Sequence, residues 1–250
     1  MRRFDAPEIL DSDSCSPADV VMCMRDLGRV NRWFGGVNTT QEMVQHVAHV
    51  TGKKHISLLE VAAGSGEVSE LVRRRLAKRG ITLAVTLSDR SQSHLPHARG
   101  ESQSHSLVSD ALALPFRDGA FDLVSCNLFA HHLNAQQLGQ FAREGLRVSR
   151  RALLINDLVR HPIHLALAYA ACAVMRSRVA WLDGLTSVRR AYVPDEIRKM
   201  LAPACAPSGR VEVSLHYLFR MGVTVWKRQE APAPEALAFA TQASELPALP

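Results

Sequence analysis

A glycine turn is the first feature of this sequence with the composition of a binding site. In "LLEVAAGSGE" (residues 58–67), Gly64 and Gly66 follow an apolar run, and Glu60 stands just before them. Glycines lack a Cβ, so the backbone N–H groups of such a turn can approach a ligand closely, and a following helix adds its positively polarised N-terminus. The stretch predicts a turn that binds a small polar ligand at the end of a buried strand.

A dinucleotide fits this turn poorly. Its G-x-G-x-x-G pattern needs a third glycine for close helix packing, and this chain has Ser69 there. Glu67 falls in the first turn of the predicted helix, where its charge would repel a pyrophosphate. The turn by itself leaves the ligand open, so the ends of the neighbouring strands must decide.

Acidic residues close the next two predicted strands. Asp89 ends one of them, where a carboxylate can accept hydrogen bonds from both hydroxyls of a ribose, and Asp110 ends the other, just before Ala111. Taken singly, Glu60, Asp89 and Asp110 could each be a turn or cap residue without a ligand. Together they stand at consecutive strand ends, and open α/β sheets bind ligands there. The set therefore favours a ligand that carries a ribose.

Two adjacent histidines, His131 and His132, follow the fourth predicted strand in "NLFAHHL". An imidazole with its ordinary pKa exchanges protons near neutral pH, so either residue could serve as a general base. The alternative is that one or both only pack or cap the chain. Asn127 and Asn156-Asp157, at the ends of the fourth and fifth strands, are a poor set for a hard cation, so we expect no metal.

The elements that must position these residues follow from the apolar pattern. Strands are predicted at 56–61, 82–88, 106–110, 121–127 and 151–157, with helices between them. Such alternation predicts a parallel sheet with right-handed crossovers. Near the end, "RVEVSLHYLF" and "RMGVTVWKR" predict two strands joined by a tight turn, and so an antiparallel hairpin. The expected fold class is α/β, with a Rossmann-like, mostly parallel sheet of seven strands.

With these strand ends in place, residues 55–227 resemble the class I S-adenosylmethionine-dependent methyltransferases, and among them the ubiquinone-methyltransferase-like branch with its type 11/25 domain. Glu60 to Gly66 resembles the family's acid-x-G-x-G-x-G motif, and "LPFRDGAFDLV" (114–124) resembles its loop and fourth strand. The chain departs from the motif at Ala62, which replaces the first glycine. The methyl group of Ala62 should reduce the space that the turn leaves for the methionine part of the cofactor. Alanine suits the position only at a negative φ.

The resemblance implies S-adenosyl-L-methionine as the cofactor. Asp89 looks like the family's ribose-binding acid, and Asp110 with Ala111 looks like its adenine-contacting pair. The full set of implied cofactor contacts is Glu60, Ala62, Gly64, Gly66, Asp89, Arg90, Asp110, Ala111 and Asn127.

The resemblance also implies a small aromatic or lipid-like acceptor of secondary metabolism, with O-methylation as the favoured outcome and His132 or His131 as the base. Two alternatives stay open: ring C-methylation of a quinol-like substrate, and a non-catalytic protein that only binds the cofactor. Nucleic-acid methyltransferases of this class resemble one another in an N/D-P-P-aromatic run after the fourth strand, and protein-arginine enzymes in paired glutamates. This chain has "NLFA" there, so neither acceptor is expected.

Three parts are expected along the chain. Residues 1–50 predict an N-terminal helical cap, residues 51–228 the methyltransferase domain, and residues 229–250, rich in proline and alanine, a loose tail. Residues 158–193, between the fifth strand and the next helix, are too long for an ordinary connection. We expect them to form a helical lid over an apolar acceptor pocket. Completion of the core and a homodimer interface are the alternatives.

Composition limits the other partners. The net charge is +6, but the arginines are scattered, and the densest run, "RRRLAKR" (73–79), falls on a predicted helix without interleaved aromatics, so no nucleic acid is expected. The five cysteines form no CxxC pair, which indicates a reduced, cytoplasmic protein. There is no secretory signal pattern, and the longest apolar run, 163–175, is too short for stable membrane insertion.

Overall fold

The computed structural model describes residues 1–227 apart from residues 5, 12–14, 96–104, 174 and 206–208, so the predicted tail at 229–250 lies outside the described residues. The strands are β1 (His55–Val61), β2 (Thr82–Asp89), β3 (His105–Val108), β4 (Phe121–Asn127), β5 (Ser149–Leu158), β6 (Arg210–His216) and β7 (Arg220–Trp226). The α-helices are α1 (Pro17–Trp33), α2 (Gly36–Thr51), α3 (Glu67–Ala77), α4 (Ala135–Val148), α5 (Pro162–Ala170), α6 (Arg178–Arg190) and α7 (Pro194–Cys205). Short 3-10 helices are η1 (Ile9–Asp11), η2 (Ala130–His132) and η3 (Ala171–Ala173).

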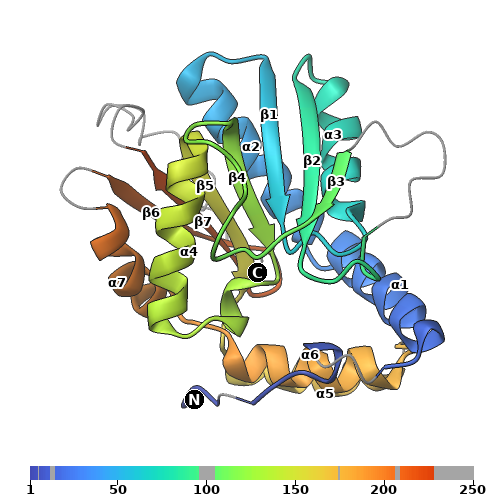
Figure 1. The fold of residues 1–250 in the computed structure, drawn as a ribbon. Helices are drawn as coiled ribbons and strands as arrows, with labels where there is room; N and C mark the ends of the chain where they lie inside the picture. The colour runs from blue at the N-terminus through green and yellow to red at the C-terminus, as the bar shows by residue number, and fades with distance from the viewer. Residues whose placement is uncertain (5, 12–14, 96–104, 174, 206–208, 228–250) are drawn as a thin grey trace, which may run out of the picture.

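The sheet confirms the predicted fold class. Its strand order is β3-β2-β1-β4-β5-β7-β6, with β7 antiparallel to both neighbours and the other pairs parallel. The order reverses between β1 and β4, so the carboxyl ends of these two central strands form the point where sheets of this kind bind ligands (Figure 1). The hairpin of β6 and β7 is also present as predicted.

The third strand ends earlier than the pattern predicts. It spans His105–Val108, whereas the sequence predicts 106–110. Asp110 turns the chain instead, because its Oδ1 accepts a hydrogen bond from the Leu112 N–H at 2.9 Å. Asp side chains often stabilise turns by bonding to a backbone group two residues on. Asp110 therefore lies in the loop beyond β3, still on the carboxyl side of the sheet.

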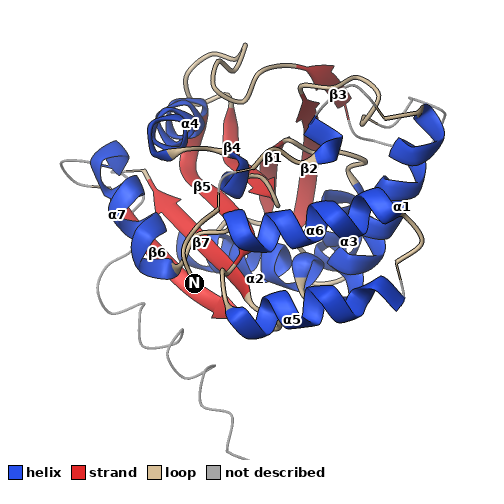
Figure 2. Cartoon of the chain, turned by 90° about the horizontal axis from the view of Figure 1, so that it is seen from below, coloured by secondary structure: helices blue, strands red, loops and turns tan. Residues whose placement is uncertain are grey.

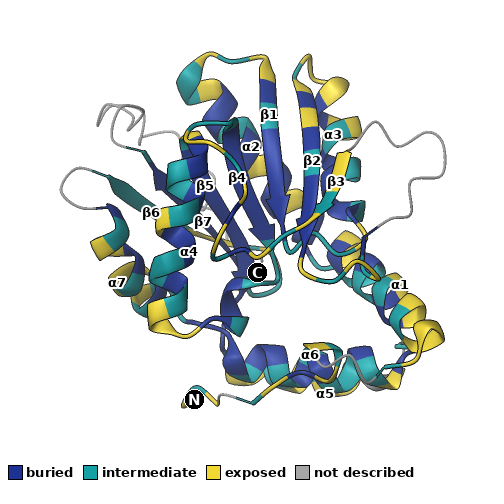
Figure 3. Ribbon diagram, in the orientation of Figure 1, coloured by how far each residue is buried: buried dark blue, intermediate teal, exposed yellow. Residues whose placement is uncertain are grey.

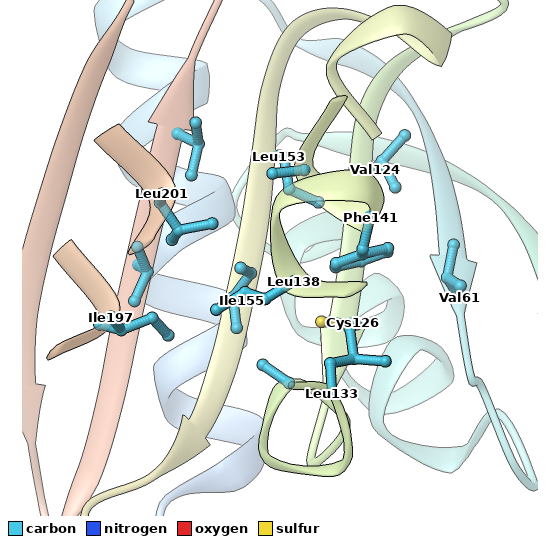
Figure 4. Packing of buried hydrophobic residues seen from close by; sticks show 14 of the residues in the cluster. Val61, Val124, Cys126, Leu133, Leu138, Phe141, Leu153, Ile155, Ile197 and Leu201 are labelled. Carbon is cyan, nitrogen blue, oxygen red and sulfur yellow. The ribbon is translucent and has the colours of Figure 1, made fainter. Parts of the chain in front are cut away.

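Two hydrophobic layers cover the faces of the sheet and hold the strand ends in place. On one face, α4 and α7 bury Phe141 and Ile197 in a cluster with Leu153 of β5 (Figure 4). On the other face, α2 and α3 bury Val44 and Val72 in a second cluster. The inner strands are buried along most of their length (Figure 3). Full burial of one such side chain contributes about 1.5–3 kcal/mol, so these layers form a firm base for the loops above them.

A third group of elements lies beyond the carboxyl ends of the strands. Figure 1 shows α1, α5 and α6 below the sheet, and Figure 2 shows the same helices crossing that end of the molecule. The N-terminal residues join this group: the Phe4 N–H donates to Arg189 O at 3.1 Å, and the Ile9 N–H donates to Asp183 Oδ1 at 2.7 Å. Since α2 packs on a sheet face, α1 and the residues before it are the N-terminal part that reaches the strand ends.

Residues 158–193 contain two α-helices, α5 and α6. The outer helix, α5, leaves large apolar side chains exposed (Ile163, Leu167 and Tyr169). The inner helix, α6, buries Leu185 and Val188, and its Trp181 Nε1–H donates to Ala168 O of α5 at 3.1 Å. The pair therefore forms a layer with a buried inner side, and its motion as a lid stays a prediction.

Candidate active site

The glycine turn joins the end of β1 to the start of α3. Gly64 and Gly66 have φ values of 54° and 68°, in the left-handed region that favours glycine. A Cβ on Gly66 would clash with the Leu87 side chain on β2, so a glycine is needed where the turn approaches that strand. The Gly64 N–H donates to Asp89 Oδ2 at 2.9 Å, which ties the turn to the end of β2.

Ala62 does not meet the condition under which alanine suits this turn. That condition is a negative φ, and the φ of Ala62 is +51°. The backbone here has a conformation suited to the glycine of the family motif. A left-handed conformation costs an L-residue about 1–2 kcal/mol, so the turn holds Ala62 under strain.

Glu60 lies beneath the turn with an enclosed carboxylate. Its Oε2 accepts hydrogen bonds from Ser69 Oγ of α3 and, at 3.1 Å, from Ser125 Oγ of β4. Burial raises the pKa of the Glu60 carboxyl, and the two hydroxyls offset only part of that effect. Glu60 thus links β1, β4 and α3 under the predicted cofactor site.

Asp89 is the last residue of β2 and lies next to the same glycine turn. Besides Gly64, the Ser91 N–H donates to its carboxylate, at 2.9 Å, and His94 Nδ1 lies 3.5 Å from Oδ1. Burial works to raise the pKa of Asp89, but the contacts from His94, Ser91 and Gly64 outweigh it and lower the pKa. Asp89 therefore presents an ionised carboxylate, the form that accepts hydrogen bonds from hydroxyls most strongly.

A cavity of about 860 Å³ opens at the carboxyl ends of the strands. The predicted site residues that line it are Glu60, Ala62, Gly64, Asp89, Arg90, Asp110, Ala111, Asn127, His131 and His132. Gly66 does not line it and serves the packing of the turn. Glu8, Asp11 and Asn31, which the sequence argument did not select, line it as well. The structure therefore brings the cofactor candidates and the acid–base candidates to one space.

Asn127, at the end of β4, lies next to a buried arginine. Arg220 of β7 is 1% exposed, and burial lowers its pKa to about 10, so it remains charged at neutral pH. Its guanidinium donates to three amide oxygens: Asn31 Oδ1 at 2.8 Å, Asn127 Oδ1 at 3.3 Å and Asn156 Oδ1 at 3.4 Å. Arg220 therefore ties α1 to the ends of β4 and β5 and fixes that wall of the cavity.

His131 is buried between two carboxylates. Its Nδ1 lies 2.7 Å from Asp157 Oδ1, and its backbone N–H donates to Asp157 Oδ2 at 2.9 Å. Its Nε2 lies 3.2 Å from Glu8 Oε1, an ion-pair contact without hydrogen-bond geometry. Burial opposes the charge on the ring, yet the pairing with Asp157 and Glu8 raises the pKa of His131 to about 10. At neutral pH His131 is therefore a held imidazolium rather than a free base.

His132 faces the same cavity and keeps 20% of its side chain exposed. Its Nδ1 lies 3.1 Å from Asp11 Oδ2, and its Nε2 lies 3.5 Å from Glu8 Oε2. The ring stacks on Phe129, with centroids 6.3 Å apart. The Asp11 contact favours the tautomer with its proton on Nδ1, which leaves Nε2 as the nitrogen that can accept a proton.

Glu8 and Asp11 are the candidates that the sequence argument missed. Asp11 is 121 residues away from His132 in the chain, and no local pattern marks an acid in an N-terminal loop. Their role becomes visible only when the fold brings η1 against η2. Among the described residues, Glu8, His131 and His132 also present atoms within 4.8 Å of one another, as metal ligands do. Their ion pairs account for this grouping, and metal-free chemistry stays a prediction.

Residues 59–152 match the family model described as a methyltransferase domain, and no curated protein sequence matches the chain. A SAM-dependent methyltransferase from Aquifex aeolicus is 17% identical, with a TM-score of 0.57 over 85% of this chain and 99% of that one. Human N-acetylserotonin methyltransferase, solved with SAM, is 14% identical, with a TM-score of 0.61 over 85% of this chain and 56% of that one. The plantazolicin methyltransferase BpumL, solved with a pentazolic desmethylPZN analog and SAH, is 11% identical, with a TM-score of 0.62 over 85% of this chain and 96% of that one.

The strand order, the glycine turn and the acid at the end of β2 define the class I methyltransferase fold. At these low identities the solved structures support the fold, and the family match supplies the activity. Residues 59–152 are thus a methyltransferase domain of the S-adenosylmethionine-dependent class, and the more specific branch stays a prediction. The cavity fits that cofactor, since bare backbone at Gly64 and an ionised Asp89 lie side by side on its wall. Among the described helices, none is long and apolar enough to cross a membrane.

Proposed function

We propose that this methyltransferase acts on an oxygen atom of a small aromatic or lipid-like acceptor. The observation that carries the proposal is that one cavity is lined both by the Gly64–Asp89 cofactor candidates and by His132. S-adenosylmethionine supplies a methyl group on a positively charged sulfur. The protein's task is then to hold the acceptor oxygen in line with that group and to remove its proton.

The cofactor end of the cavity is assigned from the strand ends. Asp89 accepts hydrogen bonds from the ribose hydroxyls, and Asp110 with Ala111 contacts the adenine. Arg90 is exposed beside Asp89 and belongs to the rim. Glu60 braces the turn from below through Oε2, which accepts from Ser69 and Ser125, and it lines the cavity as a further cofactor candidate.

The acceptor end is assigned to the histidines, with different roles. His131 keeps its proton at neutral pH, since its pKa is about 10. His132 offers Nε2 toward the cavity while Asp11 holds Nδ1. We therefore assign His132 as the base that takes the acceptor's proton, and His131 as a fixed positive charge beside it.

Transfer from labelled S-adenosylmethionine to a panel of phenols, quinols and hydroxy acids, with mass detection of the product, tests the proposal. We expect the label on oxygen for at least one acceptor. A methyl group on a ring carbon would support the quinol-type alternative instead. Cofactor binding by calorimetry without transfer to any acceptor would support a non-catalytic binding protein.

A further inference from the structure

The carboxylate of Glu8 occupies the acceptor end of the cavity. Its Oε1 lies 3.2 Å from His131 Nε2 and accepts a hydrogen bond from Ser187 Oγ at 2.7 Å. Its Oε2 lies 3.5 Å from His132 Nε2. Two imidazoles and a hydroxyl, from η2 and α6, thus face the two oxygens of one carboxylate. We call His131 and Ser187, which both contact Oε1, the carboxylate corner, and His132 remains the base.

The groups of the carboxylate corner are held in place by partners other than Glu8. Asp157 holds the His131 ring and backbone, at 2.7 and 2.9 Å. Ser187 Oγ lies 2.8 Å from the Asp183 carbonyl of its own helix, to which its single O–H can donate once Glu8 has left. The corner therefore keeps its arrangement when Glu8 leaves, as a preformed binding site must.

Glu8 itself belongs to a segment that polar contacts hold. Arg3 Nε donates to Arg190 O at 2.7 Å, and the Ile9 and Leu10 N–H groups donate to Asp183 at 2.7 and 3.0 Å. The large apolar side chains here stay exposed (Met1, Phe4 and Ile9 at 50, 57 and 38%). With little apolar surface to expose, residues 1–8 can detach at lower cost than an element of the core, while the bonds from Ile9 and Leu10 to Asp183 keep Asp11 beside His132.

We propose that the carboxylate corner is the subsite for an acidic group of the acceptor, and that Glu8 fills it as an intramolecular stand-in until the acceptor displaces it. The inference rests on the proposed function, because it names the group by which that acceptor is recognised. An acceptor carboxylate restores the ion pair and the hydrogen bond that Glu8 gives up. A neutral group of the same size leaves the buried His131 without that second negative partner, and so binds less well.

Binding of simple carboxylates to the Glu8→Ala variant tests the subsite without any methyl transfer. Acetate and benzoate should raise the melting temperature of the variant more than that of the unchanged chain, whereas acetamide and benzamide should raise neither. The double variant Glu8→Ala, His131→Gln should bind benzoate about tenfold more weakly, which corresponds to the loss of one charge-assisted contact. Equal effects of benzoate and benzamide, or no effect of the His131 change, would overturn the proposal.

The unchanged chain provides a second measurement in case Glu8→Ala does not fold. High benzoate concentrations should displace Glu8 and speed hydrogen exchange in residues 1–8, and benzamide should not. Exchange that benzoate leaves unchanged would count against a displaceable stand-in.

Steady-state kinetics separate this inference from the proposed function. With acidic acceptors, Glu8→Ala should lower KM about tenfold, because the competing carboxylate is gone. With neutral acceptors KM should change little. A variant that lowers kcat for all acceptors alike, with KM unchanged, would make Glu8 a positioning residue and overturn the subsite. Absence of transfer to any acceptor would contradict the proposed function, while the benzoate measurements would still decide the subsite.

Discussion

At the scale of single residues, His131 and His132 are chemically identical neighbours with different surroundings. His131 is 1% exposed and is paired with a carboxylate on each side. His132 is 20% exposed and lines the cavity with one nitrogen tied to Asp11. The difference in burial and in partners therefore makes His131 a fixed cation and His132 the candidate base.

Replacing each histidine should give distinct results. For a phenolic acceptor, His132→Ala should lower kcat by about 10²–10⁴, because proton removal is lost while cofactor binding is kept. Calorimetric titration with S-adenosylhomocysteine is the control, and its affinity should change little. His131→Gln should lower the melting temperature, since it removes the cation between Asp157 and Glu8. Normal turnover in soluble His132→Ala would rule out the base assignment.

Asp89 offers a second test at this scale, directed at the cofactor. Asp89→Ala removes the proposed ribose contacts and the acceptor of the Gly64 N–H, so S-adenosylmethionine affinity should fall by about 1.5–3 kcal/mol. Glu212→Ala is the matched control, because this carboxylate of β6 is paired with His46 of α2. It should leave cofactor affinity unchanged. Calorimetry that gives the same affinity for Asp89→Ala and the unchanged chain would contradict the assignment.

At the scale of elements, α5 and α6 should differ from the sheet in how readily they open. α5 has no buried residue, whereas β1 and β4 lie in the core. Amide exchange in 162–170 should therefore be faster than in 56–61 and 121–126, and should slow when acceptor and S-adenosylhomocysteine are both bound. If exchange in α5 is as slow as in β4 before any ligand is added, the lid hypothesis fails and a structural role remains.

The elements themselves were predictable to different degrees. The parallel strands and the final hairpin follow from apolar runs and turn residues, which act within a few positions of the chain. The pairing of Glu8 with His131 depends on contacts between residues more than a hundred positions apart, and no local pattern encodes such a pair. The positive φ of Ala62 also escaped prediction, because the sequence shows the residue type but not the backbone imposed by the turn.

At the scale of the whole molecule, the buried His131–Asp157 pair should make stability depend on pH. The pKa of His131 rises from 6.5 to about 10 in the folded chain, where Asp157 of β5, Glu8 of the N-terminal segment and neighbouring His132 face it. A raised folded pKa means that the stabilisation is complete below pH 6.5 and is lost as the pH rises toward about 10. Stability should fall across that window.

Urea unfolding at several pH values between 6 and 10 measures this effect. Because lysines, cysteines and tyrosines titrate in the same range, the quantity to compare is the difference in unfolding free energy between the unchanged chain and His131→Gln. That difference should shrink as the pH rises. A constant difference would mean that the pair carries no such linkage.

The position of β7 between β5 and β6 has a consequence for biosynthesis. A chain that emerges from the ribosome completes β5 long before β7 exists, so one edge of β5 stays unpaired until residues 220–226 are made. An open strand edge of this kind invites pairing with other chains. Arg220, which ties α1 to the ends of β4 and β5, arrives with the same late strand. The nascent protein therefore reaches its last third with an open sheet and an incomplete cavity wall, and chaperone protection would matter most in that interval.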